Sequence, residues 1–153
     1  MPHRPFDGQN CSIAGALSLL GERWTLLVMR EVLLGRRHFA EIKRETGVAP
    51  NILSDRLETL VDHGLLERRG PEYVPTRKGV DVNPVLVALM QWGDRYVSDE
   101  PPRVLVHAKC GHDASPSLRC AHCDEEIQTR DVRVRPGPGA SEEQRRHPLL
   151  PAP

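Results

Sequence analysis

Apolar residues in the first two thirds of the chain recur every three or four positions, which is the spacing of amphipathic helices. The pattern predicts helices at residues 11–20, 23–34, 38–45 and 50–62. The second of these is apolar on most of its sides, so we expect it to form the centre of the core. The fourth begins at Pro50, which suits the first turn of a helix, and its polar side is expected to face solvent.

Two short runs at residues 65–69 and 73–74 flank a turn signal at Gly70 and Pro71, and they predict a small β-hairpin. The order of helix, turn, helix and hairpin indicates a mainly α fold of the winged helix-turn-helix type, with the hairpin as its wing. In such a fold the second helix of the pair can enter a DNA major groove, about 12 Å wide, while the wing approaches an adjacent groove or the backbone.

A long helix is predicted after the hairpin, capped by Thr76 and running to Val97. Pro84 lies near the start of this helix and weakens it there. The apolar residues of the helix cover a broader surface than one small domain needs. This surplus suggests that the helix packs against a partner molecule.

The character of the chain changes after residue 98, where Pro101 and Pro102 interrupt the helical pattern. We expect a winged helix-turn-helix and dimerisation domain at residues 1–98 and a small Cys/His-rich unit at 99–130. A Pro/Gly-rich tail without fixed structure is expected at 131–153. The sequence pattern indicates no internal repeat.

Lysine and arginine together number 21, as do aspartate and glutamate, so the formal net charge is zero and does not favour nucleic-acid binding. The local sign of charge matters more, because phosphate contacts depend on clustered cations. The 153 residues leave no room for a large enzyme core and include no glycine-rich phosphate loop, so we do not expect an enzyme. No apolar run approaches the roughly 20 residues that span a bilayer, and we expect a cytoplasmic protein with no membrane partner.

Basic residues occur in adjacent pairs around the predicted helix-turn-helix and wing. Without a fold such pairs are ordinary solvated surface, but the predicted fold makes them one rim around the second helix, where they suit phosphate contact. The first turns of that helix carry side chains that can read base edges, since asparagine pairs with adenine and aspartate accepts from cytosine. The candidate DNA-binding residues are Arg36, Arg37, Lys43, Asn51, Ser54, Asp55, Arg56, Arg68 and Arg69. Asp55 equally suits a solvent-facing position or a pair with Arg56 or Lys43.

Several runs in about the first 97 residues carry a resemblance to a known family. The runs are CSIAGAL at 11–17, LLGERWTLLVMREVLLG at 19–35, HFAEI at 38–42, ILSDRL at 52–57, DHGLLER at 62–68, TRKG at 76–79 and WG at 92–93. Together they resemble the HxlR family of winged-helix regulators, relatives of the MarR group. The resemblance implies a homodimeric transcription regulator, with repression as the family tendency, that binds a palindromic operator on double-stranded DNA. It also implies that the first helix and the long last helix form the two-fold interface.

Cys11 lies at the start of the first predicted helix, where free backbone N–H groups and the helix dipole favour a thiolate. The resemblance implies that a cysteine at this position senses electrophiles or oxidants and changes DNA affinity when it is modified. The alternative is a small buried residue or an inert thiol in the dimer interface.

Two pairs of metal-binding residue types stand close together in the pattern His107-x2-Cys110-x9-Cys120-x2-Cys123. Each pair is spaced to close a tight turn on one ion, which is what a tetrahedral structural zinc needs. We therefore expect a zinc-ribbon-like site. A redox pair of Cys120 and Cys123, a disulfide between Cys110 and Cys120, and a metal-free thiol cluster remain as alternatives.

The favoured hypothesis is a regulator that binds DNA as a homodimer and takes its signal from a small electrophile or oxidant. The alternative is a metal- or redox-responsive protein-interaction module that dimerises without specific DNA binding. The two hypotheses share a fold and differ in whether the second helix of the pair contacts DNA.

Overall fold

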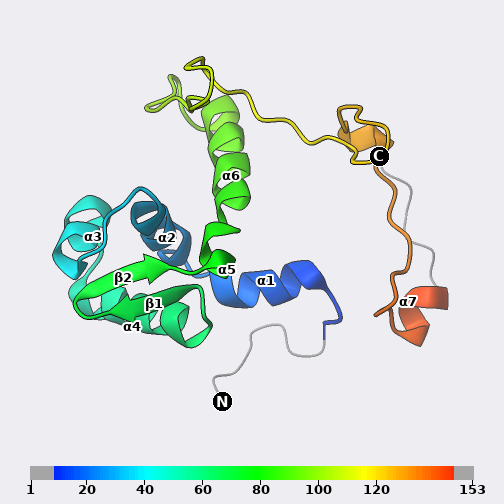
Figure 1. Cartoon of the computed structure of the whole chain (residues 1–153). Helices are drawn as coiled ribbons and strands as arrows, with labels where there is room; N and C mark the ends of the chain where they lie inside the picture. Colours follow the sequence, from blue (N-terminus) through cyan, green and yellow to red (C-terminus); the bar gives the residue numbers. More distant parts are fainter. Residues whose placement is uncertain (1–8, 147–153) are drawn as a thin grey trace. The chain divides into compact units, whose positions relative to one another are not determined.

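The chain is divided into two units in the computed structural model, which describes residues 9–146 (Figure 1). The boundary follows Asp99, so that the units are Met1–Asp99 and Glu100–Pro153. The first unit contains α1 (Ser12–Leu20), α2 (Thr25–Leu33), α3 (Phe39–Thr46), α4 (Pro50–Asp62), β1 (Leu66–Arg69), β2 (Glu72–Pro75), α5 (Arg77–Val80) and α6 (Asn83–Tyr96). The second unit contains a 3-10 helix at Thr129–Asp131 and α7 (Glu142–Arg146). None of the helices in the described part of the chain is long and apolar enough to cross a bilayer.

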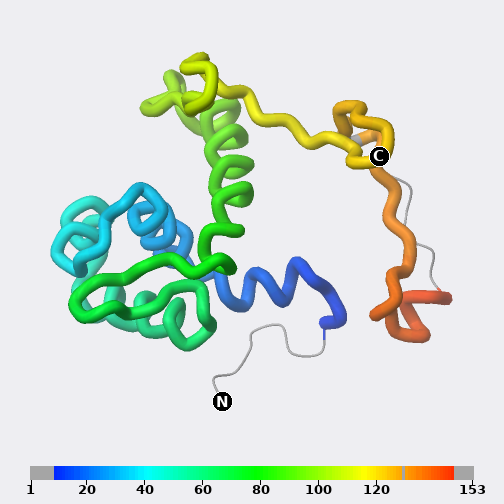
Figure 2. Tube along the Cα trace, in the orientation of Figure 1, coloured from blue at the N-terminus to red at the C-terminus, as the bar shows by residue number. Residues whose placement is uncertain are grey.

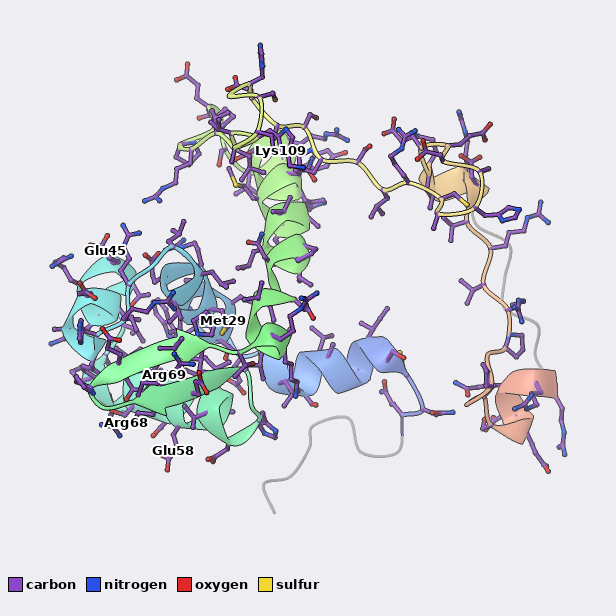
Figure 3. All side chains as sticks on the ribbon, in the orientation of Figure 1. Met29, Glu45, Glu58, Arg68, Arg69 and Lys109 are labelled. Atoms are coloured by element: carbon purple, nitrogen blue, oxygen red, sulfur yellow. The ribbon has the colours of Figure 1, made fainter. Side chains whose placement is uncertain are left out.

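Helix α2 lies at the centre of the first unit. Its side chains Val28, Met29 and Val32 are fully buried, and the helix packs against α3, α4, β2 and α6. Figure 3 shows Met29 inside this group of elements. A helix that is covered on most sides requires apolar residues almost all round, and this confirms the prediction that the second helix forms the core.

Helices α3 and α4 form the helix-turn-helix. Helix α3 ends at Gly47, whose φ of 68° lies in the left-handed region that glycine adopts without strain, and Val48 in the turn is buried. On α4, the side chains of Leu53, Leu57 and Leu60 are buried against the core. Because these positions repeat every three or four residues, the opposite side of α4 is held toward solvent.

The wing consists of β1 and β2, which pair antiparallel around a turn at residues 70–71, as predicted. The segment before α3 adds to the other side of β2. The backbone N–H of Tyr73 donates to the carbonyl oxygen of Arg37 at 2.8 Å, and His38 forms an isolated antiparallel bridge with Glu72. The wing is therefore attached through backbone hydrogen bonds to the start of the helix-turn-helix.

Glu41 fixes the start of α3. Its carboxylate accepts hydrogen bonds from the backbone N–H groups of His38 and Arg37, at 3.0 and 3.1 Å. N–H groups at a helix start have no acceptor within the helix and need one from outside it. These hydrogen bonds hold the pKa of Glu41 below its usual value, because they stabilise the charged form of the carboxyl group.

The long helix predicted from Thr76 to Val97 is instead two helices, α5 and α6. Thr76 caps only α5, where its hydroxyl oxygen accepts a hydrogen bond from the backbone N–H of Gly79 at 3.2 Å. Pro84 lies in the first turn of α6, where backbone N–H groups have no acceptor within the helix, so the N–H that proline lacks is not needed. Inside one continuous helix, its ring would clash with the preceding turn. A Cβ atom at Gly79 would lie 2.1 Å from the carbonyl oxygen of Leu65, so this glycine allows α5 to approach the hairpin closely.

Helices α1 and α6 leave much of their apolar surface uncovered. Figure 2 shows the chain passing from the hairpin through α5 into α6, which extends away from α3 and α4. No residue of α6 is buried, and Leu89, Trp92 and Tyr96 are 49%, 59% and 65% exposed. Helix α1 buries only Ala14, while Ile13 is 71% exposed. Short helices are marginal in water without tertiary packing, so both helices need a further surface to pack against.

The predicted unstructured tail contains one short helix, α7. Its start is held by two reciprocal hydrogen bonds, in which the Ser141 N–H donates to Gln144 Oε1 at 2.9 Å and the Gln144 N–H donates to Ser141 Oγ at 3.2 Å. This is a capping box, which the sequence SEEQ at 141–144 encodes without any apolar periodicity. The last part of the predicted tail, residues 147–153, lies outside the described residues.

Glu31 is a buried charge beside the apolar residues of α2. Its side chain is 2% exposed, and its carboxylate lies 2.6 Å from Arg30 Nη2 and 3.7 Å from Arg36 Nε. A carboxylate removed from water needs such cations, because an unpaired buried charge is strongly destabilising. Arg36, which the sequence places at the DNA interface, therefore has a partner inside the domain.

We expect the substitution Arg36→Ala to lower the free energy of unfolding by about 1 to 3 kcal/mol, because it removes one of the two cations that lie beside a buried carboxylate. Urea unfolding of the purified protein measures this change. The control is Arg44→Ala, whose side chain is 71% exposed and forms an exposed ion pair with Glu45, and which should change stability by less than about 0.5 kcal/mol. Equal losses in the two variants would contradict the structural role of Arg36.

Candidate nucleic-acid interface

The solvent-facing side of α4 carries polar residues at helical spacing. Asn51, Ser54, Asp55 and Glu58 are all exposed there, because the leucines on the other side of the helix fix its rotation. Figure 3 shows Glu58 at the outer edge of the domain, away from Met29 in the interior. An exposed polar helix of this kind matches the width of a DNA major groove.

Exposed cations lie on the two elements next to α4. Lys43 and Arg44 occupy the last turn of α3. Arg68 and Arg69 lie on β1 of the wing, as Figure 3 shows. The guanidinium carbon of Arg68 lies 5.7 Å from the ring centre of Tyr73, which supports this side chain without covering it. Exposed cations are held weakly by neighbouring carboxylates, so they remain available to phosphates.

Six of the nine predicted contact residues are exposed, namely Lys43, Asn51, Ser54, Asp55, Arg68 and Arg69. The other three, Arg36, Arg37 and Arg56, are half-buried and turned partly toward the protein. Arg56 Nη1 lies 3.7 Å from Glu22 Oε2, and both Arg56 Nε and Arg37 Nη1 are buried atoms. Sequence spacing could not reveal these placements, because the partners come from segments whose packing the pattern does not specify.

The outer face of α4 is acidic. Asp55, Glu58 and Asp62 are exposed on this helix, whose one cation is the half-buried Arg56. Carboxylates repel phosphates but accept hydrogen bonds from the cytosine amino group in the major groove. The positive charge that could attract a DNA backbone therefore lies on α3 and the wing and not on this face of α4. Glu58 was not among the predicted contact residues, although its spacing from Asn51 indicates the same face.

The four cysteines are free thiols, and no disulfide joins any of them. Cys11 is exposed immediately before α1. In the second unit His107 Nδ1 lies 3.2 Å from Cys110 Sγ. Hydrogen bonds to the Cys120 sulfur lower the pKa of this thiol, and the largest effect comes from the backbone N–H of Cys123. The two members of each predicted ligand pair, His107 with Cys110 and Cys120 with Cys123, thus lie close to each other. Among residues 9–146, however, no three His, Cys, Asp or Glu side chains come together around one metal position.

The chain is similar to transcriptional regulators along most of its length. The family model described as HxlR-like helix-turn-helix matches residues 19–101. The helix-turn-helix transcriptional regulator Rv3095 of Mycobacterium tuberculosis is 44% identical over 148 residues, which cover 91% of this chain and 92% of that protein. The solved structure of PA1607, a transcription-factor candidate, has a TM-score of 0.74 and 32% identity and covers 83% of this chain and 95% of that one.

A second similar solved structure is quinone-bound YodB from Bacillus subtilis, with a TM-score of 0.52 and 28% identity. That match covers 57% of this chain and 100% of the solved YodB chain. The family match extends over more than half of the chain and coincides with the observed helix-turn-helix and hairpin. These findings confirm the predicted resemblance, and the chain is a DNA-binding transcriptional regulator of the HxlR-like helix-turn-helix family.

Proposed function

We propose that this regulator binds a palindromic operator as a homodimer, with α4 of each subunit in a major groove. The rotation of α4 carries the proposal, because burial of Leu53 and Leu57 leaves Asn51 and Ser54 exposed in the first turns. Those turns are the part of a recognition helix that reaches base edges. A dimer bound across a promoter would obstruct RNA polymerase, so we propose repression as its output.

The cations beside α4 supply the affinity for the DNA backbone. Lys43 and Arg44 from α3, with Arg68 and Arg69 from the wing, give each subunit a set of exposed positive charges. Each phosphate that a cation neutralises releases counterions, and adds about 0.9 to the slope of log affinity against log salt concentration. The protein as a whole has no net charge, so this local arrangement makes DNA binding possible.

The paired substitution Asn51→Ala with Ser54→Ala should remove the preference for operator over random DNA, since each specific base contact is worth about 1 to 3 kcal/mol. Arg68→Ala should instead weaken both kinds of binding and flatten the salt dependence by about one unit per subunit. Fluorescence anisotropy with an operator selected from a random duplex library measures both effects. Arg77→Ala, an exposed cation at the base of the wing, is the matched control. Unchanged operator preference in the double variant would contradict reading by α4.

A second copy of the chain is the partner that we propose for α1 and α6. On α6 the exposed residues Val85, Leu89, Trp92 and Tyr96 share one side of the helix, at the three- and four-residue spacing of neighbours on a helix face. A two-fold axis lets such a surface pack against its own copy. The same symmetry would place two α4 helices one helical turn of DNA apart, as a palindromic operator requires.

Trp92→Glu should convert the dimer to a monomer, because it places a charge where we expect apolar surface to be buried. Sedimentation equilibrium measures the mass, and the monomer should also lose operator affinity. Gln91→Glu adds the same charge on a different side of α6 and serves as the control. A wild-type protein that sediments as a monomer would contradict the proposed interface.

We propose Cys11 as the site at which a signal reaches this interface. The thiol is exposed and stands two residues before Ile13, whose side chain is itself exposed on α1. A quinone can add to the sulfur, forming one C–S bond while the thiol proton moves to a ring oxygen. The adduct would place a bulky group beside the apolar surface that we assign to the dimer. The similarity to YodB, a relative solved with quinone bound, supports this proposal.

Benzoquinone treatment should reduce the operator affinity of the wild-type protein and leave that of Cys11→Ser unchanged. Anisotropy before and after treatment measures the affinity, and peptide mass spectrometry locates the adduct. Cys123→Ser is the comparison variant and should still respond, because it retains Cys11. An equal response in Cys11→Ser would assign the effect to another thiol.

A further inference from the structure

The second unit contains two turns with the same backbone hydrogen bonds, displaced by thirteen residues. We define the first turn as residues 105–114 and the second as residues 118–127. The bonds of the first turn are His107 N–H to His112 O at 2.9 Å, Gly111 N–H to His107 O at 2.8 Å and Ala114 N–H to Leu105 O at 2.7 Å. Those of the second are Cys120 N–H to Glu125 O at 2.9 Å, Asp124 N–H to Cys120 O at 2.8 Å and Ile127 N–H to Leu118 O at 2.8 Å. The structure thus contains a repeat that the sequence pattern did not indicate.

The two turns also share their strand pairing and their special backbone position. An isolated antiparallel bridge closes each of them, between Val106 and Asp113 in the first and between Arg119 and Glu126 in the second. The residue after each second predicted ligand has positive φ, 72° at Gly111 and 58° at Asp124. In the described part of the chain, every residue with a positive φ is a glycine except Asp124. A conformation that disfavours a side chain therefore recurs at the equivalent position of both turns.

Each turn presents two metal-binding side chains, at its third and sixth positions. In the first turn they are His107 and Cys110, whose Nδ1 and Sγ atoms lie 3.2 Å apart. In the second turn the equivalent residues are Cys120 and Cys123. The positive-φ residue that follows each pair turns the chain back, so both side chains of a pair stand at one end of a small hairpin. One pair supplies only half of the four ligands of a tetrahedral zinc ion.

The second unit lacks the apolar core that would hold it together without a ligand. Its described residues include no buried apolar side chain, and Val104, Val106 and Leu118 are 60%, 58% and 75% exposed. No disulfide is present to compensate. Units of this size that bury little apolar surface are commonly stabilised by a metal or by disulfides. The first turn has only one cysteine, so it cannot form a disulfide within itself.

We propose that the two turns close on a single zinc ion bound by His107, Cys110, Cys120 and Cys123 of the same chain. Three thiolates and one imidazole form an established set for structural zinc, and such a site leaves no open position for catalysis. The nine residues 111–119 between the two inner cysteines can reach about 30 Å when extended, so they do not prevent the pairs from meeting. Zinc binding supplies the free energy that orders such a loop, as it does in zinc-dependent small domains.

The full-length protein, purified under reducing conditions without chelator, should contain one zinc ion per chain by plasma mass spectrometry. X-ray absorption of the wild-type protein should show three sulfur ligands and one nitrogen ligand. Cys120→Ser should lose the metal, whereas the matched variant Cys11→Ser should retain it. A metal-free wild-type protein that also fails to bind added Co²⁺ with thiolate charge-transfer absorption would overturn the proposal.

A mixture of two variants distinguishes a site within one chain from a site shared by two. Cys110→Ser keeps the second turn intact, and Cys120→Ser keeps the first. Neither variant should bind zinc after the two are unfolded and refolded together, because no single chain has all four ligands. Zinc recovered by the mixture would overturn closure within one chain and assign the site to the dimer.

Proteolysis gives a readout that does not depend on any variant. Lys109 and Arg119 are trypsin sites within the two turns, and both are exposed (Figure 3 labels Lys109). Removing zinc with a chelator should speed cleavage at these two residues while the far-ultraviolet helix signal of α1 to α6 is retained. Equal cleavage rates with and without zinc would contradict a metal that orders the turns.

Discussion

The burial of Leu53, Leu57 and Leu60 against α2 is the constraint on which the interface depends. These three side chains fix the rotation of α4 and leave Asn51 and Ser54 in solvent. The apolar side of the helix must stay in the core, so a rotation that hid the polar residues would cost the transfer free energy of the leucines, about 1.5 to 3 kcal/mol each. The same packing that stabilises the domain therefore also presents the polar face of α4 that we propose as the DNA-contacting one.

The sequence predicted those elements whose apolar periodicity is strong and whose ends carry glycine or proline. It placed the core helix, the helix-turn-helix and the hairpin correctly, because buried and exposed positions in these elements alternate with the regular spacing of a helix or a strand. It missed the break between α5 and α6, where Thr76 and Pro84 mark the starts of two separate helices. It also missed α7, since a capping box at Ser141 is a local polar signal with no apolar pattern to support it.

The candidate site was predictable to the extent that it depends on one helix face. Exposure of Asn51 and Ser54 follows from α4 alone, whereas the orientation of an arginine depends on partners that come from other segments. Arg36 illustrates the difference, because its partner is Glu31, a residue whose burial no sequence pattern indicated. The repeat of the two turns in the second unit was hidden because their backbones match while most of their side chains differ. Of the equivalent positions, only those of Leu105, Ala108 and Cys110 carry the same residue in the second turn.

The winged helix-turn-helix is the DNA-binding part of this regulator, and the uncovered faces of α1 and α6 suit a second subunit. We propose that the paired turns of the second unit provide the ligands of a structural ion. The most direct test of the central claim is a hydroxyl-radical footprint of the wild-type protein on its selected operator. The account predicts two protected patches on one face of the duplex, related by two-fold symmetry and separated by about 10 base pairs. A single unsymmetrical patch, or protection that does not distinguish operator from random DNA, would contradict it.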